Sequence, residues 1–113
     1  MYTCLIVGSP GLIRMDLTET VSESVPGAFL LVAESLDEAA EVIARHKDIK
    51  AAFVQASSAL LLASPVATLL DRMSCKVILM GPDAEDETAS GAYPVLRRPY
   101  FADDVADFLN PAS

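Results

Sequence analysis

The side chains that could carry out covalent chemistry are few and widely separated. Ser9, Ser57 and Ser58 follow predicted strands, and each offers a hydroxyl nucleophile. The one histidine, His46, lies at the polar end of a predicted helix, away from these serines and without a Cys or His at ligand spacing. A serine nucleophile needs a base within hydrogen-bond distance and a group that orients this base. The sequence therefore predicts no hydrolytic triad, and we expect that the chain is not an enzyme.

The segment Gly8–Gly11 follows a predicted strand and opens a helix, which is where many proteins bind phosphate. It matches neither G-x-x-x-x-G-K-[ST] nor G-x-G-x-x-G, and Pro10 has no N–H to offer an anion. The simpler interpretation is a turn followed by a helix, with Ser9 as the N-cap and Pro10 as the first helical residue.

Apolar runs alternate with amphipathic stretches along the chain. The predicted strands span residues 3–7, 28–33, 51–54, 76–80 and 94–96. Helices are predicted after Pro10, over residues 36–43, from Ser64-Pro65, and over residues 101–109. Ser35 and Glu38 match a capping box, in which Glu38 would accept a hydrogen bond from the Ser35 amide. Residues 83–90 carry four acids and no large apolar side chain, so a fourth helix is expected to be weak or missing there.

Strands that are apolar throughout and separated by helices predict a parallel sheet covered on both faces. The expected architecture is a three-layer α/β/α flavodoxin-like fold with five strands in the order 2-1-3-4-5. The 113 residues fit one domain, residues 1–113. In such a fold ligands bind at the carboxyl ends of strands one and three, where this chain has Gly8, Ser9 and Gln55.

Two segments, Pro10–Leu17 (PGLIRMDL) and Arg97–Tyr100 (RRPY), carry a family resemblance. They are similar to the first helix and to the K-P-Y end of the fifth strand in single-domain response regulators. The chain as a whole resembles the receiver domains of two-component signalling, which implies a role in bacterial signal transduction.

The resemblance also implies where receiver chemistry would lie. The acidic pair that binds Mg²⁺ in receivers matches Gly8 and Ser9, and the phosphoacceptor Asp matches Gln55. The Thr or Ser that ends the fourth strand matches Met80, and the Lys of the K-P pair matches Arg98. Every chemically active position departs from the family pattern, which is typical of a degenerate receiver, or pseudo-receiver.

These departures remove the charges on which receiver chemistry depends. Mg²⁺ prefers anionic oxygen ligands in octahedral geometry, and a backbone, a hydroxyl and one amide oxygen do not supply them. Phosphoryl transfer needs a nucleophile and metal ions that neutralise the developing charge. We therefore expect no Mg²⁺, no other cofactor and no phosphorylation of this chain.

The expected function is that of a stand-alone pseudo-receiver without an output domain, which acts by phosphorylation-independent protein–protein contact. The expected partners are a kinase, a phosphotransferase, another regulator or a second copy of the chain. Either Tyr93 or Val95 occupies the aromatic switch position of the family. Of the three leucines at 60–62, either two are buried in a helix or some lie on an exposed contact surface. The candidate partner surface consists of Tyr93, Val95, Tyr100, Phe101, Leu60 and Leu61.

An alternative from another class is a module that binds a small anionic ligand in the crevice at Ser9, Gln55 and Arg98. In this case Arg98 would hold a phosphate or a carboxylate. Otherwise Arg98 would form an ion pair with Asp103 or Asp104.

Charge and hydropathy restrict the partners and the compartment. The formal net charge of −8 excludes a nucleic-acid surface, which requires clustered Lys and Arg. No apolar run approaches the ~20 residues of a membrane span, and the first residues lack the basic start of a signal peptide. Cys4 and Cys75 are lone thiols in predicted strands, so we expect no disulfide and a cytoplasmic location.

Overall fold

Parallel strands form one sheet in the order β2-β1-β3-β4-β5, as the sequence predicts. The computed structural model describes residues 2–9, 11–46, 48–86, 93–97 and 102–109. In chain order the strands are β1 (Thr3–Val7), β2 (Phe29–Ala33), β3 (Ala51–Gln55), β4 (Lys76–Met80) and β5 (Val95–Leu96). The expected boundaries are met within one residue in each case. The flavodoxin-like topology is thereby confirmed.

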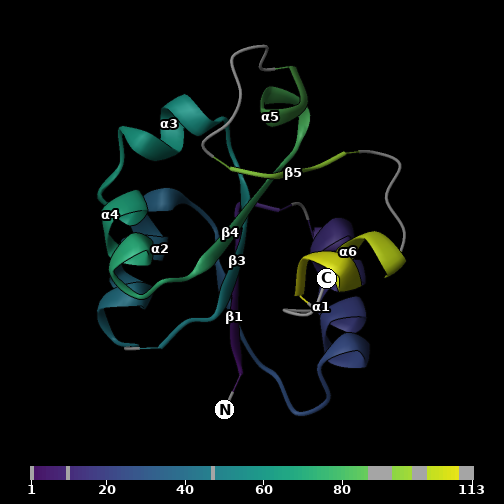
Figure 1. The fold of residues 1–113 in the computed structure, drawn as a ribbon. Helices are drawn as coiled ribbons and strands as arrows, with labels where there is room; N and C mark the ends of the chain where they lie inside the picture. The colour runs from purple at the N-terminus through teal and green to yellow at the C-terminus, as the bar shows by residue number, and fades with distance from the viewer. Residues whose placement is uncertain (1, 10, 47, 87–92, 98–101, 110–113) are drawn as a thin grey trace.

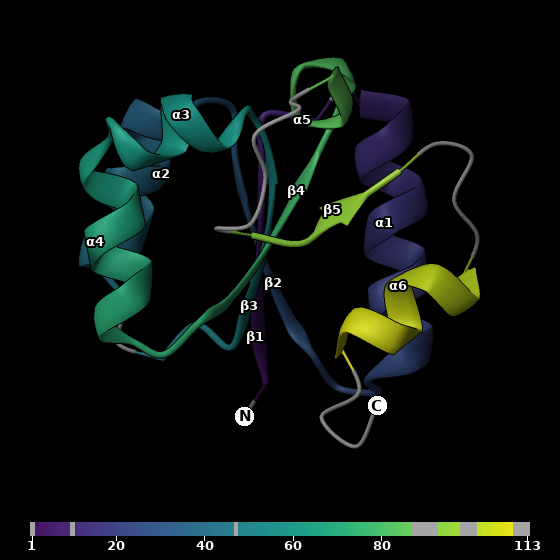
Figure 2. The ribbon, with the colours of Figure 1, turned by 45° about the horizontal axis from the view of Figure 1, so that its top comes forward.

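Helices connect the strands and cover the sheet on both sides (Figure 1). They are α1 (Gly11–Ser24), α2 (Leu36–Ala44), α3 (Ser58–Leu62), α4 (Pro65–Arg72), α5 (Pro82–Asp86) and α6 (Ala102–Leu109). Turning the molecule shows α2, α3 and α4 on one face of the sheet and α1 with α6 on the other (Figure 2). This arrangement gives the three layers that the sequence predicts.

The alternation of side chains along each strand divides the core into two clusters. Leu5 and Val7 of β1 point to the α2–α4 layer, whereas Cys4 and Ile6 point to the α1 and α6 layer. All five residues of β1 are buried, because this strand has a neighbour on each side and a helical layer on each face. This is the pattern expected of a central strand in a parallel sheet.

The edge strand β2 is less buried than expected for a sheet with helices on both faces. Phe29 is 48% exposed and Val32 is 39% exposed, and only Ala33 of this strand is buried. An edge strand has one neighbour only, so its apolar side chains are covered by fewer atoms. The apolar run of β2 therefore reflects strand propensity as well as burial.

The segments around α3 and α5 refine the sequence prediction. Residues 82–86 form a single short helix in which Ala84 is buried, consistent with a weak fourth helix. An additional short helix, α3, precedes the predicted helix at Pro65, and the hydroxyls of Ser57 and Ser64 accept hydrogen bonds from amides in the first turns of α3 and α4. The described residues of α1 start at Gly11, and Pro10, the predicted first helical residue, lies outside the described residues.

Candidate functional site

The register of the sheet brings four of the five predicted crevice residues to one edge. Gln55 at the end of β3 is paired in register with Met80 at the end of β4. Gly8 and Ser9 follow β1, whose Val7 is paired with Val54 of β3. The fifth residue, Arg98, lies outside the described residues.

Ser9 and Met80 close this edge with uncharged side chains. The Ser9 hydroxyl donates a hydrogen bond to the Met80 sulfur across 3.7 Å, and both residues are almost fully buried, at 7% and 2% exposure. A thioether is a weak acceptor and carries no charge. Ser9 and Met80, which lie at the ends of different strands at this edge of the sheet, thus contact each other here.

Gln55 lies over the backbone of Gly81. A Cβ atom added to Gly81 would come within 2.6 Å of the Gln55 Cγ, and Gly81 has a φ of +96°, a region that favours glycine. Gly8 also approaches Gln55 closely, because its Cβ position would lie 3.7 Å from the Gln55 Cβ. The Gln55 side chain therefore fills the space at the carboxyl ends of β3 and β4, and it is only partly exposed there.

A pocket of about 540 Å³ lies at the predicted crevice edge, beside Gly8 and Gln55, but the sequence did not indicate Glu34, Asp37 or Leu60 as part of its lining. It extends from the carboxyl ends of β1 and β3 to the starts of α2 and α4. Its lining combines apolar side chains with two carboxylates, those of Glu34 and Asp37. The lining residues are Val7, Gly8, Glu34, Ser35, Leu36, Asp37, Gln55, Ala56, Leu60, Ala63, Ser64 and Pro65. The sequence signal was limited to Gly8, Glu34 and Ala56, each of which directly follows a strand whose carboxyl end lies at this edge.

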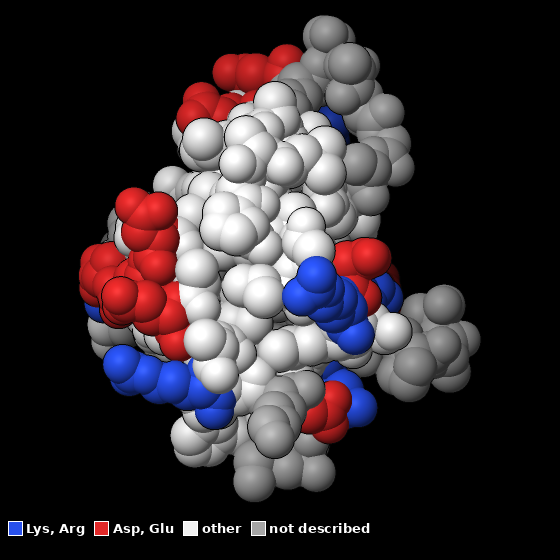
Figure 3. All heavy atoms as spheres, turned by 90° about the vertical axis from the view of Figure 1, so that its left-hand side faces the viewer, with Lys and Arg blue, Asp and Glu red and all other residues white. Residues whose placement is uncertain are grey.

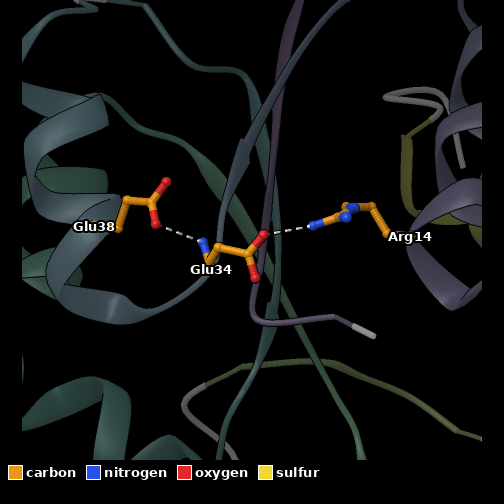
Figure 4. Close-up of polar contacts among 3 residues, drawn as sticks. All are labelled: Arg14, Glu34 and Glu38. Carbon is orange, nitrogen blue, oxygen red and sulfur yellow. Dashed lines mark hydrogen bonds and ion pairs between the residues drawn. The ribbon is translucent and has the colours of Figure 1, made fainter. Parts of the chain in front are cut away.

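Glu34 is held on both sides by contacts from separate elements (Figure 4). The Arg14 guanidinium on α1 lies 3.0 Å from the Glu34 Oε1, and the backbone N–H of Glu34 donates to the Glu38 Oε2 across 3.2 Å. The Arg14 and Glu34 side chains are 31% and 72% exposed. An ion pair this exposed contributes little stability, because water screens it, but it orients the carboxylate at the pocket rim.

The capping box at the start of α2 is confirmed in one half and wrong in the other. The Ser35 hydroxyl accepts a hydrogen bond from the Glu38 amide across 3.1 Å, as predicted. The Glu38 carboxylate, however, accepts from the amide of Glu34 rather than from that of Ser35. This shifted contact ties the β2–α2 connection to α2 next to the pocket.

The predicted partner surface is only partly accessible. Leu60 is 57% exposed, whereas Leu61 is fully buried, so Leu61 is removed from the surface. On a short helix, consecutive side chains point about 100° apart, and the middle leucine alone faces the core. Tyr93 and Val95 are half-buried. Tyr100 and Phe101 lie outside the described residues.

Tyr93 lines a second, smaller pocket of about 300 Å³ between α4 and the β4–β5 edge. Cys75 and Asp71 also line it, together with Ala67, Lys76, Val77 and Pro94. Tyr93 packs against the core cluster of the α2–α4 layer, and so does Val95.

The two cysteines are free thiols, as expected, and are poor nucleophiles. Burial raises the pKa of the Cys4 thiol to about 12, and the nearby Cys75 adds to this rise. Burial likewise raises the pKa of the Cys75 thiol to about 12. Since the thiolate is the reactive form, both groups act as small apolar side chains near neutral pH.

Within the described residues, no three or more His, Cys, Asp or Glu side chains are grouped to hold a metal ion. The expected absence of Mg²⁺ binding stays a prediction. None of the helices in the described ranges is long and apolar enough to cross a membrane.

Comparison with protein-family models, with curated proteins and with solved structures finds no match for this chain. The sheet order and the layers alone therefore assign the fold. A flavodoxin-like fold supports many unrelated activities, so the function has to follow from the side chains at the site.

Proposed function

We propose that this protein is a pseudo-receiver that acts in two-component-type signalling by protein–protein contact, without phosphoryl transfer. One observation carries the proposal. The carboxyl ends of β1, β3 and β4 present Gly8, Ser9, Gln55 and Met80, where a receiver has carboxylates and a hydroxyl. The motifs at residues 10–17 and 97–100, which resemble those of response regulators, support the same proposal.

The absence of charged side chains at Gly8, Ser9, Gln55 and Met80 explains why phosphoryl transfer is not expected. A metaphosphate-like transition state needs metal ions and positive groups that neutralise its oxygens. The Ser9 hydroxyl is engaged with the Met80 sulfur, and an amide nitrogen or oxygen such as that of Gln55 is a weak nucleophile. Contact with other proteins does not require these charges.

The experiment treats the protein with Mg²⁺ and acetyl phosphate and measures its intact mass and its melting temperature. We expect no phosphoryl adduct and no change in melting temperature, whereas an ordinary receiver domain treated in parallel gains both. Gln55→Asp restores the acceptor alone, and we expect it to stay unphosphorylated because Gly8 and Ser9 supply no carboxylate. An acid-stable or hydroxylamine-sensitive adduct on the native chain would contradict the proposal.

The alternative function, binding of a small anion, has one observation in its favour. The pocket beside Gly8 and Gln55 offers enough volume for a small molecule. Its rim carries the carboxylate of Asp37, which repels an anion, and that of Glu34, whose charge is balanced by Arg14. A thermal-shift screen with phosphate, nucleotides and dicarboxylates decides between the two, since stabilisation by any of them favours the ligand-binding module.

A further inference from the structure

Two large apolar side chains are exposed on α3 next to the pocket. Leu60 lines the pocket and is 57% exposed, and Leu62, which does not line it, is also 57% exposed. Leu61 between them is buried and anchors the helix to the core. A short helix that presents two leucines to solvent beside a cavity is a common feature of interaction surfaces.

The charges around these leucines are mainly acidic. Asp37, Glu38 and Glu41 on α2 are exposed, and so are Asp83 and Asp86 on α5. Figure 3 shows this face of the molecule: uncharged surface runs between one acidic group on the side of α2 and another at the end occupied by α5. The pocket itself opens between the apolar wall of Leu36, Leu60 and Pro65 and the carboxylates of Glu34 and Asp37.

We propose that this face, with Leu60, Leu62 and the pocket at Glu34 and Asp37, binds a protein segment whose apolar side chains are flanked by Lys or Arg. Leu60 and Leu62 are two residues apart on α3 and point to different sides of this helix. One apolar side chain of the segment therefore packs against Leu60 at the pocket, and a second packs against Leu62. A basic side chain enters the pocket, where its aliphatic stem contacts Leu36 and its charge meets the carboxylate of Asp37; the Glu34 carboxylate beside it is already paired with Arg14. The inference rests on the proposed function, because it assigns the surface through which contact occurs and the chemistry of the partner.

Two other occupants fit the observations less well. A second copy that used the same face would place the acidic residues of α2 against their own equivalents, which is unfavourable in a two-fold interface. A small organic cation would fill the pocket but leave Leu62, which lies outside the lining, uncovered. A basic and apolar protein segment satisfies both the charges and the leucines.

The test uses a fluorescent peptide with Leu and Lys at helical spacing, and binding is measured by polarisation. We expect binding that weakens as NaCl rises from about 50 mM to about 300 mM, because the ion pairs are screened. A matched peptide with Glu in place of Lys, and one with Ser in place of Leu, should bind at least about tenfold more weakly.

Variants of the protein locate the surface. Leu60→Ser should weaken binding by about fivefold or more, and Asp37→Asn by about threefold. Matched controls lie on the opposite face of the sheet: Met15 on α1 is 67% exposed, and Asp107 on α6 is exposed. Met15→Ser and Asp107→Asn should leave the affinity unchanged, and circular dichroism confirms that each variant is folded.

Other outcomes contradict the inference. Equal losses for Asp37→Asn and Asp107→Asn would show general attraction to an acidic protein, and equal losses for Leu60→Ser and Met15→Ser would show apolar binding that is not confined to this face. The pocket would be reassigned to small cations if hexylamine or butylguanidine competes with the peptide and if Leu62→Ser does not change the binding of either cation. Dimerisation that Leu60→Ser abolishes would assign the face to a second copy. A phosphoryl adduct on the native chain would contradict the proposed function alone. The peptide measurements do not depend on that result.

Discussion

Gln55 and Gly81 are matched to each other at the edge of the sheet. The Gln55 side chain lies where any Cβ at position 81 would be, and the backbone at Gly81 has positive φ. Gln55 is thus a packing residue, because its side chain fills the space next to the Gly81 backbone. Its neighbours Ser9 and Met80 are joined by a hydrogen bond, so the side chains at this edge of the sheet contact one another through neutral groups.

A glycine-to-alanine comparison measures this match. Gly27 has a φ of +83° with no atom within 4 Å of its Cβ position, so Gly27→Ala should cost only the backbone strain of about 1–2 kcal/mol. Gly81→Ala adds overlap with Gln55 and should cost about 2–4 kcal/mol. In a Gln55→Ala background the extra cost should disappear. The measurement is urea unfolding, and equal losses at Gly27 and Gly81 would show that Gln55 moves aside freely.

The raised pKa values of the thiols predict a loss of stability at high pH. The unfolded thiols titrate near their ordinary pKa of 9.0, and the folded ones near 12, so the folded state disfavours the thiolate. The stabilisation is complete below pH 9 and is lost as the pH rises through 12. The midpoint of urea unfolding should fall over this range, and less steeply in a Cys4→Ala, Cys75→Ala variant. A parallel fall in both proteins would assign the effect to other groups.

At the scale of elements, the ends of the helices show how local sequence and tertiary contacts combine. The cap of α2 is a local contact, because the Ser35 hydroxyl accepts from the Glu38 amide, as the sequence predicts. The Glu38 carboxylate instead accepts from the Glu34 amide, and the Glu34 carboxylate also contacts Arg14 of α1. The end of α4 is a Schellman motif, since the Cys75 amide donates to the Leu70 carbonyl and the Ser74 amide to that of Asp71. Ser74 is the only described residue other than glycine with positive φ, at 54°.

Replacing this serine should stabilise the protein. Ser74→Gly relieves the left-handed strain at a position where glycine is the usual residue, and the free energy of unfolding should rise by about 0.5–1 kcal/mol. The matched control is Ser22→Gly on the exposed face of α1, which should destabilise the helix by about 0.5 kcal/mol. Denaturant midpoints report both changes. If Ser74→Gly lowers the free energy of unfolding, then the contacts of the Ser74 side chain stabilise the protein by more than the positive φ of this residue destabilises it.

At the scale of the whole molecule, acidic side chains outnumber basic ones by 16 to 8. On the face shown in Figure 3, acidic groups lie on the side of α2 and at the end of α5, and Lys or Arg groups lie at other edges of the uncharged surface between them. The acids are the groups that the proposed basic and apolar partner would meet. Leu60 and Leu62 are both exposed on this face.

This imbalance predicts that salt stabilises the free protein. Screening reduces the repulsion among the acidic groups, so the melting temperature should rise by about 2–5 °C between about 0.05 M and 0.5 M NaCl. Glu41→Lys, on the exposed side of α2, lowers the excess of negative charge and should show a smaller rise. A flat or falling melting temperature would show that favourable ion pairs outweigh the repulsion.

The sequence by itself determined the sheet order, the strand boundaries and the neutral character of Gly8, Ser9 and Gln55. Apolar runs and residue types are local properties, and the topological rules for parallel sheets turn them into an architecture. Only the tertiary structure decided which of the three leucines is buried, and it alone brought Glu34 and Asp37 to the rim of a pocket with Leu60. It also paired Ser9 with Met80, 71 positions apart. These contacts depend on the register and packing of elements that are distant in the chain, and no local pattern specifies them.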